Sequence, residues 1–211
     1  MDAKCLVLYH PSRLILTTMP SATSTIISTL PTRQTAVVAE GPGKLSVRHD
    51  LPVPALGLAQ AIVQTTAVAI NPADAKMLDY SAAVGAIHGY DFSGTIVALG
   101  TDVPSHLAVG DRVAGLAHGG NAAEPMIGGF CEYVAVDADL LFKLPDNMSF
   151  GQGASLGTGV GTALLCIFQE LGLPTSLLEQ PRQPGEKDSS FVLVAGGSTA
   201  TGTRALQFLK M

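Results

Sequence analysis

The sequence has no tryptophan and few aromatic residues of any kind, and only 14% of its 211 residues are charged. It contains no run of lysine and arginine, and its net charge is −5. Such a chain lacks the basic field that attracts a phosphate backbone or an anionic lipid surface, and it lacks the aromatic platforms on which single-stranded bases stack. Neither nucleic acid nor membrane is therefore an expected partner.

Cysteine is scarce as well, with only Cys5, Cys131 and Cys166. An odd, widely spaced set describes neither a disulfide framework nor a zinc-binding cysteine pair, so a reducing, cytoplasmic environment is expected. No uninterrupted apolar run reaches roughly 18 residues, so neither a membrane span nor a secretory signal is predicted. With 47% hydrophobic residues, the chain can nevertheless bury a sizeable core.

The pattern along the chain changes twice. Residues 1–33 are rich in Ser, Thr and Pro without a steady period, which predicts a poorly ordered extension. Residues 34–150 contain short β-like runs separated by Gly and Pro, which predict an all-β domain. The predicted strands are "TAVVAE", "LSVRHD", "QAIVQTTAVAIN", "GTIVALG", "DRVAGLA" and "FCEYVAVD".

After Pro145 the pattern becomes helical, and residues 151–211 are expected to form interdomain helices, a linker and the truncated start of a second domain. The segments "MSFGQGASLG" and "VGTALLCIFQELG" predict helices that end at Gly172 and Pro174. The charged, proline-containing stretch from 173 to 190 predicts a surface linker. The order "FVLVA", "GGSTATG", "TRALQFLKM" then predicts a buried parallel strand, a glycine turn and a helix, the opening unit of a dinucleotide-binding fold.

The glycine turn between Gly196 and Gly202 is a candidate phosphate site. Small residues let the backbone approach a pyrophosphate, and the following helix N-terminus offers N–H groups and a partial positive charge. The spacing departs from GxGxxG, so a turn without a ligand is the alternative. The hydroxyls of Ser198, Thr199 and Thr201 favour phosphate.

A second candidate lies in "AVAINPADAKMLD", where an Asn-Pro junction ends a strand. The junction forces a change from extended chain to turn, and it places Asp74 and Lys76 at the start of a short helical turn. A lone lysine is usually just solvated, so the surrounding motifs decide how Lys76 is interpreted.

Those motifs resemble the medium-chain dehydrogenase/reductase superfamily in order and spacing, over residues 35–211. The blocks are "AINPADAKMLD", "GYDFSGTIVALG", "VGDRVAG", "GGFCEYVAVD", "LPDNMSFGQGASL" and "VLVAGGSTATGT". Two of them, "NPADAK" and "GGSTATGT", are most similar to the trans-acting enoyl reductases that partner fungal polyketide synthases. The resemblance implies an α+β and α/β fold, with a GroES-like β-barrel domain followed by the truncated start of a Rossmann domain.

The resemblance also implies that no metal is bound. Zinc alcohol dehydrogenases of this superfamily supply a ligand from a Gly-His-Glu block, whereas this chain has Tyr90-Asp91 in place of His-Glu. The closely spaced cysteines of a structural zinc lobe are missing, and the five histidines show no ligand spacing.

The site residues that the resemblance implies fall into three groups. The nicotinamide end of an NADPH cleft between the two domains would be lined by Ala73, Asp74, Ala75 and Lys76. The phosphate end would be lined by Ser198, Thr199, Ala200 and Thr201. A substrate-facing segment would comprise Thr162, Ala163, Leu164, Leu165, Cys166, Ile167, Phe168 and Gln169, for which an ordinary buried helix is the alternative. Lys76 and Thr162 are the candidates for stabilising charge on the substrate oxygen.

The implied reaction is NADPH-dependent reduction of an α,β-unsaturated thioester, carried on an acyl carrier domain of a polyketide synthase, by a monomeric enzyme. A complete family member continues for about another domain, and without it the "FVLVA" strand would have unpaired edges. We therefore expect little or no activity from this chain alone. The alternatives are a zinc-free quinone or enone reductase, and a non-catalytic module in which residues 35–150 dock on a synthase.

Overall fold

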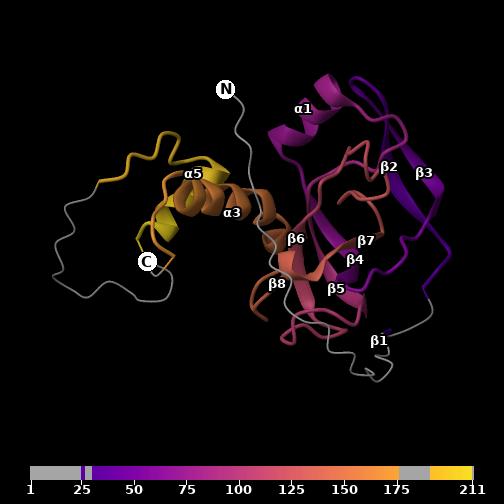
Figure 1. Cartoon of the computed structure of the whole chain (residues 1–211). Coiled ribbons are helices and arrows are strands. Elements are labelled where there is room, and N and C mark those ends of the chain that lie inside the picture. Colours follow the sequence, from indigo (N-terminus) through magenta and orange to yellow (C-terminus); the bar gives the residue numbers. More distant parts are fainter. Residues whose placement is uncertain (1–24, 27–29, 176–190, 211) are drawn as a thin grey trace, which may run out of the picture.

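The computed structural model describes residues 25–26, 30–175 and 191–210 (Figure 1). In this part of the chain no helix is long and apolar enough to cross a membrane. The predicted extension and the predicted linker lie largely outside the described residues. Within the range of the extension, Thr25–Ile26 form strand β1, which pairs antiparallel with the end of β5 (Asp91–Leu99).

All six predicted β runs are confirmed as strands. The main sheet has the order β7-β4-β5-β6-β8, with β1 also on β5, and all of its pairs are antiparallel. Strands β2 and β3 form a separate two-stranded sheet. The strands not yet given bounds are β2 (Arg33–Gly41), β3 (Lys44–Pro52), β4 (Gln60–Ala69), β6 (Arg112–Leu116), β7 (Tyr133–Asp137) and β8 (Phe142–Lys143).

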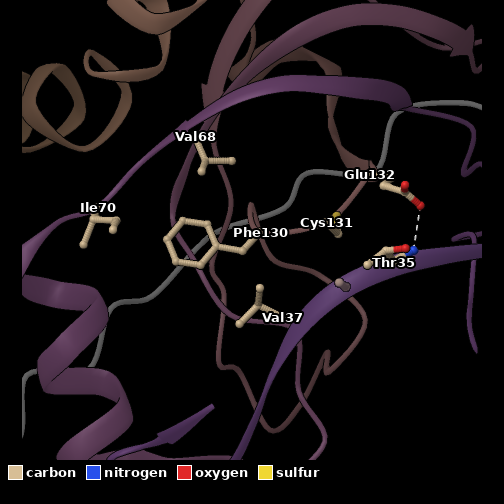
Figure 2. A pocket seen from close by; sticks show the side chains of 8 residues that line it. Thr35, Val37, Val68, Ile70, Phe130, Cys131 and Glu132 are labelled. Atoms are coloured by element: carbon tan, nitrogen blue, oxygen red, sulfur yellow. Dashed lines mark hydrogen bonds between the residues drawn. The ribbon is translucent and has the colours of Figure 1, made fainter. Parts of the chain in front are cut away.

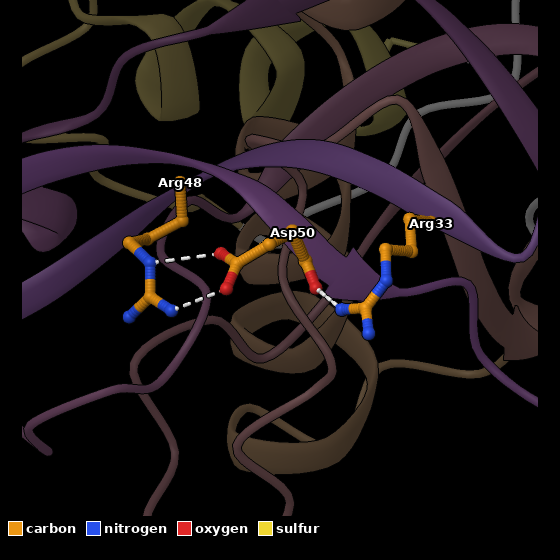
Figure 3. Close-up of polar contacts among 3 residues, drawn as sticks. All are labelled: Arg33, Arg48 and Asp50. Atoms are coloured by element: carbon orange, nitrogen blue, oxygen red, sulfur yellow. Dashed lines mark hydrogen bonds and ion pairs between the residues drawn. The ribbon is translucent and has the colours of Figure 1, made fainter.

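The β2–β3 hairpin turns at Pro42-Gly43. Gly43 has φ +69°, which suits glycine at the second central position of a tight turn, and proline fixes the first. On the exposed side of the hairpin, Arg48 pairs with Asp50 at 2.9 Å, and Arg33 donates to the Asp50 carbonyl (Figure 3). The hydrogen bond from Arg48 lowers the pKa of Asp50, but solvent screens so exposed a pair and it adds little stability.

The hairpin packs over the main sheet and closes the core. Val37 joins it to the rest of the domain in both directions, because its N–H donates to the Phe130 carbonyl and its carbonyl accepts from the His88 N–H, each at 2.9 Å. Apolar residues of both sheets are buried between them. The largest buried side chains are Phe92, Ile96, Val63, Val113 and Val134 of the main sheet, together with Ile87 from the segment before β5.

The predicted helices are confirmed, with the bounds α1 (Pro72–Ser81), α2 (Phe150–Ala154), α3 (Gly157–Leu164) and α5 (Ala200–Phe208). A π-helical segment, Leu165–Glu170, continues α3 directly. Helix α2 begins at Ser149, whose hydroxyl accepts from the Gln152 N–H at 3.2 Å, as a capping residue should. Gly172, with φ +65°, follows the end of the π-helical segment.

The predicted strand "FVLVA" is not formed, which corrects the expectation for this segment. Residues 191–194 have no strand pairing, and Phe191 and Leu193 are 97% and 93% exposed. A parallel strand needs neighbours, and no described strand lies beside this one. Helix α5 instead packs on α3, where Ala163, Ile167 and Ala205 form a small buried cluster (Figure 1).

Shortening a buried side chain should destabilise the protein far more than shortening an exposed one. Phe92 is completely buried, so we expect Phe92→Ala to lower the free energy of unfolding by about 3–5 kcal/mol. Val47 on β3 is 57% exposed, and Val47→Ala is the control that should cost far less. Urea unfolding of both variants tests this, and equal losses would contradict the assigned core.

Candidate functional site

Three segments that are far apart in the sequence meet at the carboxylate of Asp91, the first residue of β5. Its Oδ2 accepts a hydrogen bond from Nδ2 of Asn71 at 3.0 Å. Its Oδ1 accepts from the backbone N–H of Thr158 at 2.7 Å and from the Thr158 hydroxyl at 2.6 Å. Asn71 immediately precedes α1 and Thr158 is the second residue of α3, so one side chain holds the starts of both helices.

The sequence around Asp91 suits this arrangement. Helix α3 has no capping side chain of its own, and the Asp91 carboxylate accepts from its first turn instead. A Cβ on Gly157 would lie 2.7 Å from Oδ1 of Asp91, so only glycine allows the approach. Asp91 is 1% exposed, and its three donors and the positive end of α3 offset the loss of hydration.

Asp74, which sequence reasoning assigned to the cofactor cleft, is a second buried carboxylate. Its two oxygens accept from the backbone N–H groups of Asn71 at 2.6 Å and Tyr90 at 3.1 Å, and its carbonyl lies 2.8 Å from Nε2 of His88. Burial raises the pKa of Asp74, and the hydrogen bond from Asn71 acts in the opposite direction. The carboxylate therefore fixes the start of α1 against the segment before β5.

The other residues predicted for the nicotinamide end lie on the same helix with different exposure. Ala73 is half-buried, whereas Ala75 and Lys76 are exposed. The ammonium group of Lys76 is therefore open to a ligand, while the carboxylate of Asp74 is already engaged.

The glycine turn is closed by its own side chains. The Thr199 hydroxyl donates to the Gly196 carbonyl at 2.8 Å and accepts from the Gly202 N–H at 3.0 Å, which makes Thr199 the N-cap of α5. A Cβ on Gly202 would lie 2.2 Å from the Gly196 carbonyl oxygen, so the turn requires glycine there. Ser198 and Ala200 are exposed, and Thr201 is half-buried.

The turn also lies against the start of α3. Arg204 donates to the carbonyls of Ala200 at 3.2 Å and Ser155 at 3.4 Å. A Cβ placed on Gly159 would lie 3.5 Å from the Ala200 carbonyl oxygen, an ordinary contact distance, so α3 and the start of α5 lie side by side here. Helix α3 thus contacts both the glycine turn and the Asp91 carboxylate.

The predicted substrate segment has two sides. Ala163 and Ile167 are buried against α5, with Phe168 packed beside them, as in an ordinary buried helix. Leu164 is half-buried, and the remaining residues are exposed: Thr162, Leu165, Cys166 and Gln169. Thr162 follows Thr158 by four positions, so both occupy one face of α3. The second half of the segment is π-helical, a form that often marks functional sites.

The structure does not gather metal ligands. No three His, Cys, Asp or Glu side chains come together anywhere in the described ranges. Of the histidines, His88 is buried, and His49, His106 and His118 are exposed.

An open apolar groove of about 380 Å³ lies between β2 and the end of β4 (Figure 2). Val37, Val68, Ile70 and Phe130 are among the residues that line it. Ile70 is 83% exposed and directly precedes Asn71, so the groove begins one residue from the Asp91 contact. At its other end Glu132 accepts from the Thr35 N–H at 2.6 Å.

The chain is similar to proteins of known family. Residues 57–146 match the family model described as the alcohol dehydrogenase GroES-like domain. The chain is 63% identical over 195 residues to the trans-enoyl reductase caaB of Aspergillus niger, covering 92% of this chain and 52% of that protein. The chain thus contains the GroES-like domain of the medium-chain dehydrogenase/reductase superfamily. It spans about half the length of the curated relatives that it matches.

Solved members of the superfamily share the fold. The quinone oxidoreductase from Coxiella burnetii is 30% identical with a TM-score of 0.55, covering 65% of this chain and 45% of that one. A mycobacterial structure in complex with NADPH is 24% identical with a TM-score of 0.57, covering 82% and 48%. The predicted GroES-like domain is thereby confirmed over residues 57–146, and superfamily members bind NADPH.

The two described cysteines should differ sharply in reactivity. Burial raises the pKa of the Cys131 thiol to about 12, and its Sγ lies 3.2 Å from the Gly128 carbonyl, whereas Cys166 is exposed. In a Cys5→Ser variant at pH 8 we expect the Cys166 thiol to react rapidly with a chromogenic disulfide. The Cys131 thiol should react only after unfolding. Equal rates in the native protein would contradict the exposed position of Cys166.

Proposed function

We propose that this chain carries the GroES-like half of an NADPH-dependent trans-enoyl reductase, which reduces an α,β-unsaturated thioester held on an acyl carrier domain of a polyketide synthase. The observation that carries the proposal is the 63% identity to a trans-enoyl reductase. That match covers 92% of the chain and therefore includes both residues 71–76 and residues 162–169.

The glycine turn fits a dinucleotide phosphate. Glycines at 196 and 202 keep side-chain atoms away from the backbone, and the first N–H groups of α5 have no partner within the helix. Gly196, Ser198 and the backbone of Ala200 and Thr201 would hold the phosphates, and Ala73, Ala75 and Lys76 would border the nicotinamide. NADPH, when bound, supplies the hydride for the β-carbon of the enoyl group.

The protein groups would act on the thioester. The Lys76 ammonium and the Thr162 hydroxyl are both exposed, and each can donate a hydrogen bond to an oxygen that gains negative charge as hydride arrives. The exposed side of the π-helical segment, with Leu165 and Cys166, would contact the acyl chain. Asp74 would act indirectly, because its carboxylate holds the start of α1 in place.

The similarity to a quinone oxidoreductase supports a second candidate, reduction of a free quinone or enone. The two candidates share the cofactor and the hydride step and differ in the substrate. A carrier-bound thioester brings a phosphopantetheine arm and a protein partner, whereas a free enone brings neither.

A chimera tests the activity. The 211 residues replace the matching half of the Aspergillus niger relative, and NADPH oxidation is followed with a carrier-bound enoyl thioester and with a free quinone. We expect thioester reduction, and a loss of about a hundredfold in kcat/KM for Lys76→Ala or Thr162→Val, because each removes one donor to the developing charge.

Lys44→Ala, at the exposed end of the hairpin, is the control and should leave the rate unchanged. Reduction of the quinone but not of the thioester would favour the second candidate. A chimera that binds NADPH and reduces neither substrate would contradict both.

The 211-residue chain alone should bind NADPH weakly. Residues 191–194 form no strand, so the sheet that normally supports the phosphate turn is not assembled among the described residues. Fluorescence titration with NADPH, and with NADH as the comparison, measures this. Tight and NADPH-selective binding would show that the turn and α1 suffice without that sheet.

A further inference from the structure

Resting on the function proposed above, we propose that Asp91 is the positioning residue of the reductase cleft. Its carboxylate fixes the start of α3 relative to the start of α1, and thereby sets the place of Thr162 relative to the cofactor-binding end of α1. Sequence reasoning treated Asp91 only as part of the block that replaces His-Glu.

The contact at Asp91 is complete. Both carboxylate oxygens are used, with Oδ2 facing Asn71 and Oδ1 facing Thr158, at distances from 2.6 to 3.0 Å. Hydrogen bonds to a charged acceptor are short and strong, and a buried site keeps water from competing for them. The three partners come from segments 20 and 67 positions away from Asp91.

Hydrogen bonds do not hold the two helices equally. The start of α1 has a further anchor, because Asp74 accepts from the Tyr90 N–H just before β5. Among the hydrogen bonds between described residues, only those made by Asp91 connect α3 to β5 or to α1. Loss of the Asp91 contact would leave the start of α3 placed only by packing and by α2, whose Phe150 carbonyl accepts from the Ser93 hydroxyl of β5, while α1 keeps its own anchor.

The path from Asp91 to the candidate site is short. Thr162 lies one helical turn beyond Thr158, or about 6 Å along the axis. A shift of Thr158 is carried along the helix to Thr162 and to the π-helical segment that follows. Because a misplacement of about 1 Å in a catalytic group can cost a hundredfold in rate, this bond matters beyond stability.

The position of α3 relative to α1 can be measured without an activity assay. Spin labels are attached to Cys166 and to an Asp79→Cys substitution on the exposed side of α1, in the 211-residue chain with Cys5→Ser; Cys131 is buried and stays unlabelled. We expect a narrow distance distribution in this parent. The distance distribution should broaden or shift in the Asp91→Ala and Thr158→Val variants. Thr158→Ser keeps the hydroxyl and should show the parent distribution.

Ser155→Ala is the matched control, since it removes only the local bond from its hydroxyl to the Gln152 carbonyl. Circular dichroism identifies any variant that fails to fold. Parent-like distributions in Asp91→Ala and Thr158→Val overturn the proposal, and if Asp91→Ala does not fold, a parent-like Thr158→Val alone overturns it.

The kinetic arm uses the chimera described above. Thr158→Val should lower the single-turnover rate of thioester reduction about tenfold or more, with the NADPH dissociation constant nearly unchanged, and Thr158→Ser should restore the rate. An unchanged rate per bound NADPH would overturn the positioning role. A chimera without any reductase activity would defeat the proposed function, while the distance measurement would still decide whether Asp91 positions α3.

Discussion

The arrangement of the helices depends on the hydrogen bonds that the buried carboxylate of Asp91 accepts. A charge with 1% exposure is unfavourable unless hydrogen bonds replace its hydration, and here three donors do so. Each neighbouring residue type follows from that requirement. Asn71 supplies an amide donor, Thr158 supplies a hydroxyl next to a free N–H group, and Gly157 leaves room for the carboxylate.

Asp74 adds a second buried carboxylate close to the first, and the pair makes this region sensitive to pH. Burial raises the pKa of Asp74, and the nearby charge of Asp91 contributes in the same direction. Because the raised pKa lies above that of the unfolded chain, Asp74 contributes stability at acidic pH, and this contribution is lost as the pH rises through its folded pKa. Near neutral pH the two N–H bonds to Asp74 offset part of that loss. The hydrogen bonds of Asp74 thus hold the start of α1 in place, but burial of its carboxylate lowers the stability of the fold near neutral pH.

The fold was largely predictable where the signal is local. Gly and Pro separate the β runs, and the helical segments end at Gly172, so these elements could be placed from neighbouring residues alone. The strand at 191–195 was predicted from its apolar, β-branched composition and is not formed, because a strand depends on partners that composition does not supply.

The candidate site was predictable only in part. The glycine turn and α1 were found from motifs, and both have the expected local form. The role of Asp91 was missed because its partners lie 20 and 67 positions away, and no pattern within a short window relates them. One signal was present: an acidic residue opens "DFSGTIVALG", a run that is otherwise almost entirely apolar or small. A charge at the start of a buried strand needs donors from elsewhere, and Asn and Thr before or within helices are suitable sources.

Helix α3 is where these constraints combine. Its first turn is bound to Asp91, its residue Gly159 lies beside the Ala200 carbonyl, and its continuation carries the exposed side of the candidate substrate segment. Its buried side packs against α5, so residues on the two sides serve different purposes. A substitution at Ala163 or Ile167 would alter packing with α5, whereas one at Thr158 would alter orientation with respect to β5. The exposed face with Thr162 is sensitive to both, since it belongs to the same short helix and cannot move independently of either contact.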